Sequence, residues 1–307
     1  MNSGTLATPV TSQSAITAGQ RFRQALATTS PLAIVGAVTP YCALMAQHAG
    51  HKALKLAGVG PYGLGHPDLG ITTLNDLLTA VRRITDVCPL PVMVDAETGF
   101  GSELNISRLV KGLIKDGAAA MHIEDQVPLK RCGHQPGKAV VPKAEMVARI
   151  MAAVDARTDP SFFICARTDA LALEGLSAAI DRACAYREAG ADMILPEACS
   201  DLAQYRAFVD ALDRPHSVVA SLAEFSKTPA FTLDELRGAG VSAAIFSMSA
   251  ARAMAAAALK VYQAILRDGS VKNVIDVMQT REEMYEILGY YEYEKKADRI
   301  LGGKTEA

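Results

Sequence analysis

Short apolar, β-branched runs alternate with longer stretches of helical periodicity along most of the chain. A run of about four to eight such residues between turn signals is typical of a strand in a parallel sheet buried on both faces. Several runs follow a helix that ends in glycine, as in "IKDGAAAM" and "REAGADMI". The pattern predicts strands over residues 32–38, 53–58, 91–97, 119–125, 162–168, 193–198, 217–222 and 243–248.

Eight strand–helix units favour a closed (β/α)8 barrel of the TIM type over an open doubly wound sheet. No Gly-x-Gly-x-x-Gly segment follows the first predicted strand, so a dinucleotide-binding fold is not indicated. The stretch "GVGPYGLG" at residues 58–65 lacks the Lys-Ser/Thr pair of a P-loop. We expect it to be an adaptable loop at the barrel mouth, with carboxylate or phosphate binding by its amides as an alternative role.

The two ends of the chain differ in character. Residues 1–18 lack the basic and apolar regions of a signal peptide and are expected to be a flexible tail. Residues 19–307 are expected to form a single barrel domain with a C-terminal helical extension. Residues 280–300 predict an amphipathic helix, with apolar positions that include Met284, Ile287, Leu288 and Tyr291. Two interpretations stay open for this helix: packing on its own barrel, or exchange with a neighbouring subunit.

The composition excludes several classes of protein. A net charge of −2, with both signs scattered through 307 residues, offers no basic stripe for nucleic acid. No apolar run approaches the ~18 residues that a membrane-spanning helix needs. The six cysteines lack C-x-x-C spacing, which fits a reducing cytoplasm better than a secreted disulfide scaffold. We therefore expect a cytoplasmic protein that acts on a small molecule.

Charged residues stand at the ends of four consecutive predicted strands: Asp95 and Glu97, Glu124 and Asp125, Arg167 and Asp169, and Glu197. One such carboxylate alone is more often a helix N-cap, but in a barrel these strand ends converge on one face. Clustered carboxylates need a cation, and Mg²⁺ suits ligands that are all oxygen. Arg167 needs an anionic partner. The pattern therefore predicts metal-assisted chemistry on a small carboxylic or phosphorylated acid.

Residues 126–143, "QVPLKRCGHQPGKAVVPK", form a connection after the fourth strand that is long enough to be a functional lid. Its Cys132 has four conceivable roles: disulfide partner, metal ligand, nucleophile or acid. The dispersed cysteines disfavour a disulfide, and the lack of grouped His and Cys disfavours a zinc site. Lys130, Arg131 and His134 are cations that favour an ionisable thiol, hence an acid or base. A nucleophile stays open, although no protease or hydrolase signature accompanies it.

The motifs "VDAETGFG", "HIEDQ", "KRCGH", "ARTDAL" and "EAGADMILPEA" resemble those of the isocitrate lyase and phosphoenolpyruvate mutase superfamily, and within it the methylisocitrate lyases. The resemblance runs from about residue 19 to about residue 300. It implies a homotetramer of (β/α)8 barrels that exchange their last helix, with Mg²⁺ at the mouth and Mn²⁺ as a possible substitute. It also implies cleavage of a 2-hydroxy di- or tricarboxylate to a 2-oxo acid, such as pyruvate, and a dicarboxylate, such as succinate.

The resemblance also implies a metal site. Asp95 matches the principal metal-site aspartate of the family, and Glu97 takes the place of a second aspartate. Asp68 and Glu124 match residues that hold the water shell of the metal. These four carboxylates are therefore the candidate metal residues.

The same resemblance implies the roles on the substrate side. Arg167 and Glu197 match substrate-binding and charge-organising positions, and Cys132 matches the acid that protonates the departing dicarboxylate carbanion. The candidate substrate-binding positions are Ala57, Gly58, Val59, Arg131, Gly133, His134, Gln135 and Ser221.

Several of these positions depart from the family pattern. The usual Tyr-x-Ser-Gly-Gly segment reads "KLAGVG", so Lys55 stands where a tyrosine is proposed to handle the substrate hydroxyl proton. Lys55 is either the base, with a pKa lowered by burial and the metal, or a structural lysine. Ala57 and Val59 replace serine and glycine, Gln135 an arginine, and Ser221 an asparagine. A different or bulkier 2-hydroxy acid therefore stays open as the substrate.

Three functions are consistent with this pattern. The leading interpretation is a Mg²⁺-dependent carbon–carbon lyase, because the whole Lys-Arg-Cys-Gly-His motif is retained. A decarboxylase, hydrolase or mutase of the same superfamily, acting on a 2-oxo acid such as oxaloacetate, needs the metal but not the cysteine. A diverged binding protein is the third interpretation, and Lys55 and Ala57 are its best support.

Overall fold

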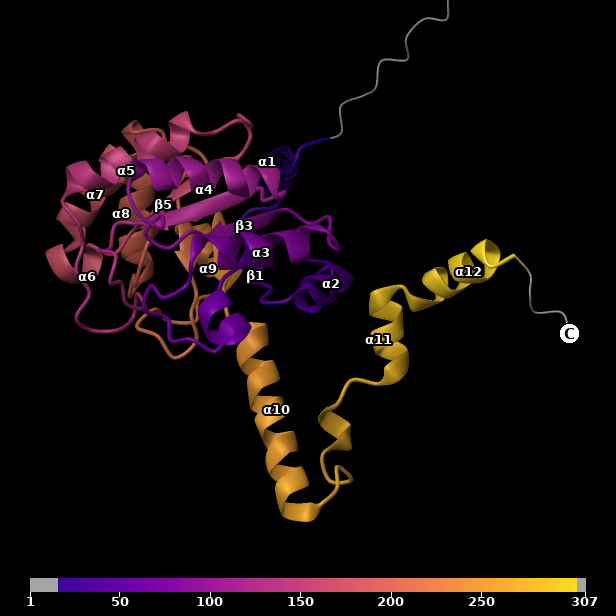
Figure 1. Ribbon diagram of the computed structural model, residues 1–307. Coiled ribbons are helices and arrows are strands. Elements are labelled where there is room, and N and C mark those ends of the chain that lie inside the picture. Colours follow the sequence, from indigo (N-terminus) through magenta and orange to yellow (C-terminus); the bar gives the residue numbers. More distant parts are fainter. Residues whose placement is uncertain (1–15, 303–307) are drawn as a thin grey trace, which may run out of the picture.

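A computed structural model describes residues 16–302, and the rest of the chain lies outside the described residues. Eight parallel strands form a barrel that helices surround (Figure 1). The strands lie in the order β6-β5-β4-β3-β2-β1-β8-β7, and a bridge between Ile194 and Val218 brings β6 beside β7. All eight predicted strands are confirmed, each somewhat shorter than predicted: β1 Leu32–Gly36, β2 Ala53–Leu56, β3 Val92–Asp95, β4 Ala120–Glu124, β5 Phe163–Thr168, β6 Met193–Pro196, β7 Val219–Ser221 and β8 Ala243–Phe246.

Helices connect the strands and extend beyond the barrel at both ends of the chain. The glycines before the strands act as predicted: Gly117, at a φ of 82°, follows α4 and lets the Ala118 N–H donate to the Leu113 carbonyl at 2.9 Å. The helices are α1 Ala18–Thr28, α2 Pro40–His48, α3 Leu74–Thr85, α4 Glu103–Lys115, α5 Lys143–Asp155, α6 Leu171–Glu174, α7 Leu176–Glu188, α8 Leu202–Leu212, α9 Leu233–Gly238, α10 Ser249–Asp268, α11 Arg281–Leu288 and α12 Tyr290–Ile300.

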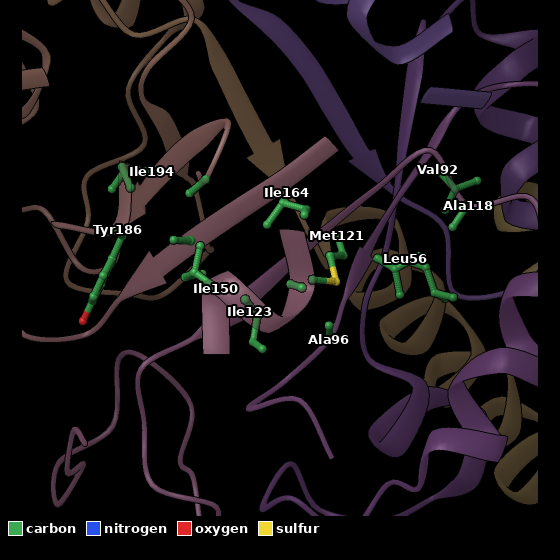
Figure 2. Packing of buried hydrophobic residues seen from close by; sticks show 14 of the residues in the cluster. Leu56, Val92, Ala96, Ala118, Met121, Ile123, Ile150, Ile164, Tyr186 and Ile194 are labelled. Atoms are coloured by element: carbon green, nitrogen blue, oxygen red, sulfur yellow. The ribbon is translucent and has the colours of Figure 1, made fainter. Parts of the chain in front are cut away.

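Two apolar clusters hold the barrel together. One lies between the strands and the surrounding helices, and includes Leu56, Met121 and Ile164 (Figure 2). The other is formed by the alternate, inward-facing strand residues and includes Phe163 and Cys165.

Helix α1 belongs to the inner cluster and covers the end of the barrel where the strands begin. The fully buried Phe22 packs edge-on against Phe163, the first residue of β5, with ring centres 5.1 Å apart. The predicted tail lies outside the described residues except for its last three, and α1 already begins at Ala18, capped by Thr17. Because α1 covers this end, the opposite end is left for a site.

The C-terminal helices leave the barrel (Figure 1). Helix α10 projects away from it and exposes apolar side chains such as Leu259 and Leu266. The chain then returns to α2, where the Tyr41 hydroxyl donates to the Gln279 side chain at 2.7 Å. The segment predicted as one helix over residues 280–300 is two, because Gly289, at a φ of 65°, separates α11 from α12. Within residues 16–302, no helix has the length and apolar character needed to cross a bilayer.

Candidate active site

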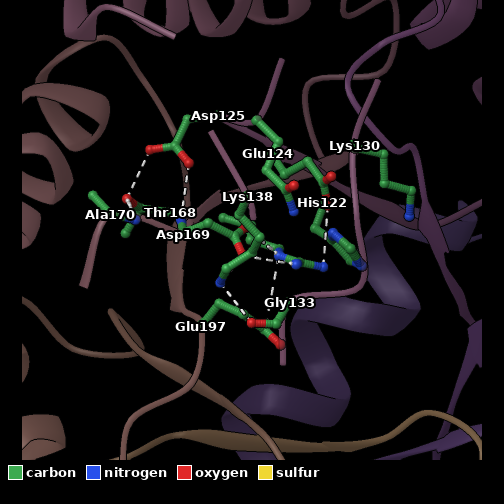
Figure 3. Close-up of polar contacts among 12 residues, drawn as sticks. His122, Glu124, Asp125, Lys130, Gly133, Lys138, Thr168, Asp169, Ala170 and Glu197 are labelled. Carbon is green, nitrogen blue, oxygen red and sulfur yellow. Dashed lines mark hydrogen bonds and ion pairs between the residues drawn. The ribbon is translucent and has the colours of Figure 1, made fainter. Parts of the chain in front are cut away.

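The carboxyl ends of β3 to β6 bring charged side chains together at the mouth of the barrel, as the sequence predicts (Figure 3). Strand register sets this arrangement, because Asp95 on β3 pairs with His122 on β4. In the same way, Glu124 on β4 pairs with Arg167 on β5. Glu197 follows the end of β6 and is buried. These side chains form one cluster although they are far apart in sequence.

Arg167 is the centre of the cluster. The residue is 8% exposed, and its guanidinium contacts three carboxylates: Glu124 at 3.1 Å, Asp169 at 2.9 Å and Glu197 at 3.6 Å. Burial lowers the pKa of Arg167, but the three carboxylates outweigh burial and raise this pKa well above its ordinary value. Arg167 is therefore a fixed cation, held in one orientation at the barrel mouth.

The four candidate metal carboxylates are each paired with a cation. The Lys130 ammonium lies 2.7 Å from Asp68 and also contacts Glu97. Asp95 lies 3.8 Å from the Lys55 ammonium, and Glu124 is paired with Arg167. Among the described residues, no three acidic, histidine or cysteine side chains converge as a ready-made ligand set. Mg²⁺ commonly takes only one or two protein carboxylates and keeps several waters, so this spacing is compatible with a hydrated ion.

The electrostatics of Glu124 and Glu97 fit a divalent cation. Both carboxylate oxygens of the fully buried Glu124 lack a hydrogen bond, and burial raises the pKa of Glu124 to about 8 against the effect of Arg167. Burial, together with the charge of Asp95, raises the pKa of Glu97 to about 7. Such carboxylates take up a proton when no cation neutralises them.

The sum of charges points in the same direction. Six carboxylates meet four cations in the cluster, so its net charge with all groups ionised is −2, which one divalent ion would neutralise. The carboxylates are Asp68, Asp95, Glu97, Glu124, Asp169 and Glu197, and the cations are Lys55, Lys130, Lys138 and Arg167.

Lys55 lies inside the barrel, next to Asp95. It is 1% exposed, and its ammonium has no hydrogen-bond partner. Burial lowers the pKa of Lys55 to about 8, although the charge of Asp95 opposes this shift. His122, 3.4 Å from Asp95, has a pKa lowered to about 4 by burial and is therefore neutral at pH 7. Of Lys55 and His122, only Lys55 is still charged at pH 7, and it loses its proton slightly above neutral pH.

The segment after Lys55 forms one wall of the mouth. Ala57 is buried, and Gly58, at a φ of 68°, leads into a π-helical turn over Val59–Leu64. This turn replaces the loop that the sequence predicts. The positive φ favours glycine at this position, whereas the Met248 methyl group, 2.5 Å from a Cβ atom placed there, is the end of a flexible side chain that can move.

The loop that carries Cys132 packs onto the charged cluster. A Cβ atom at Gly133 would lie 2.5 Å from Cγ of Glu197 and 2.6 Å from Nη2 of Arg167. The His134 Nε2 atom lies 3.1 Å from Glu197. The Cys132 thiol itself is free and exposed. The two residues that follow Cys132 therefore pack on Arg167 and Glu197, next in sequence to an exposed thiol.

The cations near Cys132 are used differently from the sequence prediction. Lys130 and His134 contact carboxylates of the cluster, because buried carboxylates bind a cation more strongly than an exposed thiol does. The Arg131 guanidinium donates to the Pro136 carbonyl at 3.3 Å. The structure thus pairs each of these three side chains with an oxygen atom of another residue, and their effect on the thiol stays a prediction.

The remaining candidate positions lie at two places. Arg131, Cys132 and Gln135 line a cavity of about 350 Å³ together with Asp68 and its neighbours. Ser221 ends β7 and is half-buried, and three strands separate it from β3, which carries Asp95, in either direction around the barrel. The structure thus gathers the loop residues beside the charged cluster and places Ser221 across the mouth.

Lys138 is a site residue that the sequence analysis missed. Its ammonium is buried and lies 2.8 Å from Asp169 and 2.5 Å from the Gly133 carbonyl (Figure 3). The only sequence signal is its place in the long loop after the fourth strand. A lysine in a polar loop has no periodicity that would predict burial.

Comparisons with known proteins agree with this geometry. The phosphoenolpyruvate phosphomutase family matches residues 22–266. A 2-methylisocitrate lyase of Salmonella typhimurium is 58% identical over 93% of this chain and 97% of its own length, and one of Escherichia coli is 57% identical over 92% and 96%. The structure of a 2,3-dimethylmalate lyase superposes with a TM-score of 0.85 at 32% identity, covering 94% of this chain and 97% of that chain. An oxaloacetate acetylhydrolase structure gives 0.87 at 31% identity, covering 95% and 99%.

These relatives match this chain over nearly their whole length, at 57–58% identity for the two 2-methylisocitrate lyases and at 31–32% for the two solved structures. The family match spans the barrel from α1 to α10, which includes every candidate site residue. The protein therefore belongs to the isocitrate lyase and phosphoenolpyruvate mutase superfamily.

Proposed function

We propose that the protein is a Mg²⁺-dependent carbon–carbon lyase that cleaves 2-methylisocitrate, or a related 2-alkylmalate-type acid, to a 2-oxo acid and a dicarboxylate. The products from 2-methylisocitrate would be pyruvate and succinate. The observation that carries this proposal is the seating of the Cys132 loop on Arg167 and Glu197, beside the carboxylates of the barrel mouth. The sequence identity to 2-methylisocitrate lyases supports the choice of substrate.

The metal would be held at the mouth by Asp95, with Glu97, Asp68 and Glu124 holding its water ligands. Bound there, Mg²⁺, or Mn²⁺ in its place, would stabilise negative charge that develops on the substrate oxygens. Arg167 binds a substrate carboxylate, since its guanidinium is fixed and always charged. The other substrate contacts in this proposal are made by Ala57, Gly58, Val59, Arg131, Gly133, His134, Gln135 and Ser221.

The reaction needs one base and one acid. Lys55, in its neutral form, takes the proton of the 2-hydroxyl group. The C–O single bond then becomes the carbonyl double bond of the 2-oxo acid as the carbon–carbon bond breaks. The electron pair of that bond goes to the departing dicarboxylate fragment. The Cys132 thiol then donates its proton to this carbanion, so that the proton removed from one fragment is balanced by one given to the other.

The assembly in this proposal is a homotetramer in which α10 to α12 pack on a neighbouring subunit. An apolar cavity of about 650 Å³ supports this, because it opens beside β1, β8 and α2 and is lined by side chains such as Val35, Met45 and Phe246. The exposed apolar side chains of α10 offer a matching surface. A solution mass of four times the 32.5 kDa chain, measured by light scattering, would support the tetramer.

We place the enzyme in the cytoplasm, as a single barrel domain from residue 19 onward. All six cysteines are free, which suits a reducing compartment. Small-molecule carboxylates are its only proposed ligands besides the metal, because the net charge of −2 offers nothing to nucleic acid.

The deciding experiment is mass spectrometry of the products formed from isocitrate, 2-methylisocitrate, 2-alkylmalates and oxaloacetate in the presence of Mg²⁺. We expect pyruvate and succinate from 2-methylisocitrate. Cys132→Ser should abolish turnover and leave pyruvate binding intact, whereas Cys184→Ser, at a half-buried cysteine away from the site, should change neither. Full activity in Cys132→Ser would contradict the acid role.

Two other results would replace the proposal. Turnover of oxaloacetate alone would favour the second interpretation, a hydrolase or decarboxylase. An oxaloacetate acetylhydrolase is among the structures similar to this chain. Inactivity toward the whole panel, with retained binding of 2-oxo acids, would favour a diverged binding protein.

A further inference from the structure

The Cys132 loop is fastened on both sides of the cysteine by buried side chains. The Gln126 amide donates to the Arg131 carbonyl at 2.9 Å and accepts from the Arg131 N–H at 3.0 Å. On the other side, the Lys138 ammonium donates to the Gly133 carbonyl at 2.5 Å. Gln126 is fully buried and Lys138 is 9% exposed. Both peptide neighbours of Cys132 are thus hydrogen-bonded to side chains anchored in the barrel.

Lys138 also joins the loop to the central arginine. Its ammonium lies 2.8 Å from Asp169, and Asp169 accepts two hydrogen bonds from Arg167, at 2.9 and 3.1 Å. Gly133 itself packs against Arg167 and Glu197. One buried ammonium, through Asp169, therefore links the loop to Arg167.

A merely structural role does not account for both clamps. The ion pair between Lys138 and Asp169 does not require the second bond that this ammonium donates to the Gly133 carbonyl. The side-chain amide of Gln126 uses both its nitrogen and its oxygen to bind the backbone of one residue, Arg131, in a largely polar and exposed loop. The two clamps share one feature, which is that they hold the residues immediately before and after Cys132.

We propose that Gln126 and Lys138 are positioning residues that hold Cys132 at a fixed distance from the substrate bound by Arg167. This inference rests on the proposed function for its catalytic consequence, since a misplaced acid slows proton transfer to the carbanion. The clamp itself is a property of the loop, and can be measured without turnover. A displacement of a reacting group by about 1 Å can cost about 100-fold in rate.

The test uses the full-length protein and two readouts. Lys138→Met and Gln126→Glu each remove a donor to the loop, and Gln126→Glu keeps the acceptor for the Arg131 N–H. Lys143→Met is the matched control. Lys143 is the first residue of α5, the helix that follows the loop, and forms an exposed ion pair with Asp181 of α7. Hydrogen exchange followed by mass spectrometry reports on residues 129–138, and steady-state kinetics with 2-methylisocitrate report on the thiol.

We expect both clamp variants to speed exchange in residues 129–138 by about tenfold or more, since a hydrogen bond from a charged donor is lost in one and a buried amide donor in the other. The kcat should fall about 100-fold while the KM stays within about threefold, because the acid is misplaced but Arg167 remains. Both clamp variants should also melt at a lower temperature, because Lys138→Met takes one cation from the buried Asp169 and Gln126→Glu buries a new carboxylate, so all measurements are made where the variants are folded. Lys143→Met should change none of these quantities.

Unchanged exchange in the loop of both variants would overturn the clamp, whatever the activity. Faster exchange with an unchanged kcat would overturn the positioning role. A rise in KM at unchanged kcat would assign Lys138 to substrate binding instead and so also contradict it. If the wild type turns over no acid of the panel, the proposed function fails, and the exchange data still decide whether the clamp exists.

Discussion

Replacing Gly133 by alanine tests how closely the Cys132 loop is seated on the substrate site. A Cβ atom at this position would lie 2.5 Å from Cγ of Glu197 and 2.6 Å from Nη2 of Arg167. Ordinary contacts begin at 3.4 Å, so the added methyl group would be about 0.9 Å too close to Glu197 and about 0.8 Å too close to Arg167. Gly133 has no positive φ, so the backbone conformation itself accepts alanine. The effect of the substitution is therefore purely one of space.

The methyl group can be accommodated in two ways, and both disturb the reaction. Either the loop lifts by about 1 Å and carries Cys132 away, or Glu197 and Arg167 turn aside and misplace the substrate carboxylate. A shift of that size costs about 100-fold in rate, or about 2.7 kcal/mol in activation free energy. The free energy of unfolding should fall by only about 1–3 kcal/mol, which is typical of an overpacked site.

The assay is pyruvate release from 2-methylisocitrate, coupled to NADH oxidation, alongside thermal unfolding of the same samples. Gly238→Ala is the matched control, because a Cβ atom there meets nothing within 4 Å. It lies at the end of α9, where alanine is expected to stabilise the helix by up to about 1 kcal/mol and leave kcat unchanged. Wild-type kcat in Gly133→Ala, with the fold intact, would refute the close seating of the loop.

Two further predictions concern the charged cluster. Lys55→Met should abolish turnover but raise the free energy of unfolding near pH 7, because burial lowers the pKa of Lys55 from 10.5 to about 8 and the native state must hold this charge at a cost. Between these two pKa values the unfolded state binds more protons than the native state, so the free energy of unfolding of the wild type rises with pH. In urea unfolding, it should rise by about 2 kcal/mol relative to that of Lys55→Met from pH 7 to pH 10. A pH-independent difference between the two unfolding free energies would contradict the pKa shift. Mg²⁺ should bind more tightly as the pH rises from 6 to 9, since Glu97 and Glu124, with pKa values of about 7 and 8, must release protons first. Isothermal titration calorimetry in two buffers of different ionisation enthalpy measures both the affinity and the released protons, and an affinity independent of pH would exclude these carboxylates from the metal site.

The fold could be predicted from the sequence because its signals are periodic. Apolar runs at regular spacing indicate buried parallel strands, and the ends of parallel strands share one face of a barrel. That reasoning brought Asp95, Glu124 and Arg167 together correctly. Gly289 shows its limit, because an amphipathic pattern continues through residues 280–300 while one glycine at a φ of 65° divides the helix.

The partners of the charged residues could not be predicted in the same way. Lys130 and Lys138 come from a loop, where no period indicates which side chains turn inward. The sequence predicts a role near Cys132 for Lys130 and none for Lys138, whereas carboxylates of the cluster pair with both. The choice between these partners depends on desolvation: an unpaired buried carboxylate is far costlier than an exposed thiol without a cation, and burial is known only from the folded chain.

Lys55 and the metal site are linked through Asp95. The Lys55 ammonium lies 3.8 Å from Asp95, whose charge raises the pKa of Lys55 against the effect of burial. A divalent cation on Asp95 would cancel that effect and repel the ammonium, so the loaded site favours loss of the lysine proton. A base for the substrate hydroxyl must be neutral, and in the proposed reaction this coupling would make Lys55 neutral at a pH where it is otherwise charged. Lysine in place of the tyrosine would then keep a base at this position whose protonation depends on the metal.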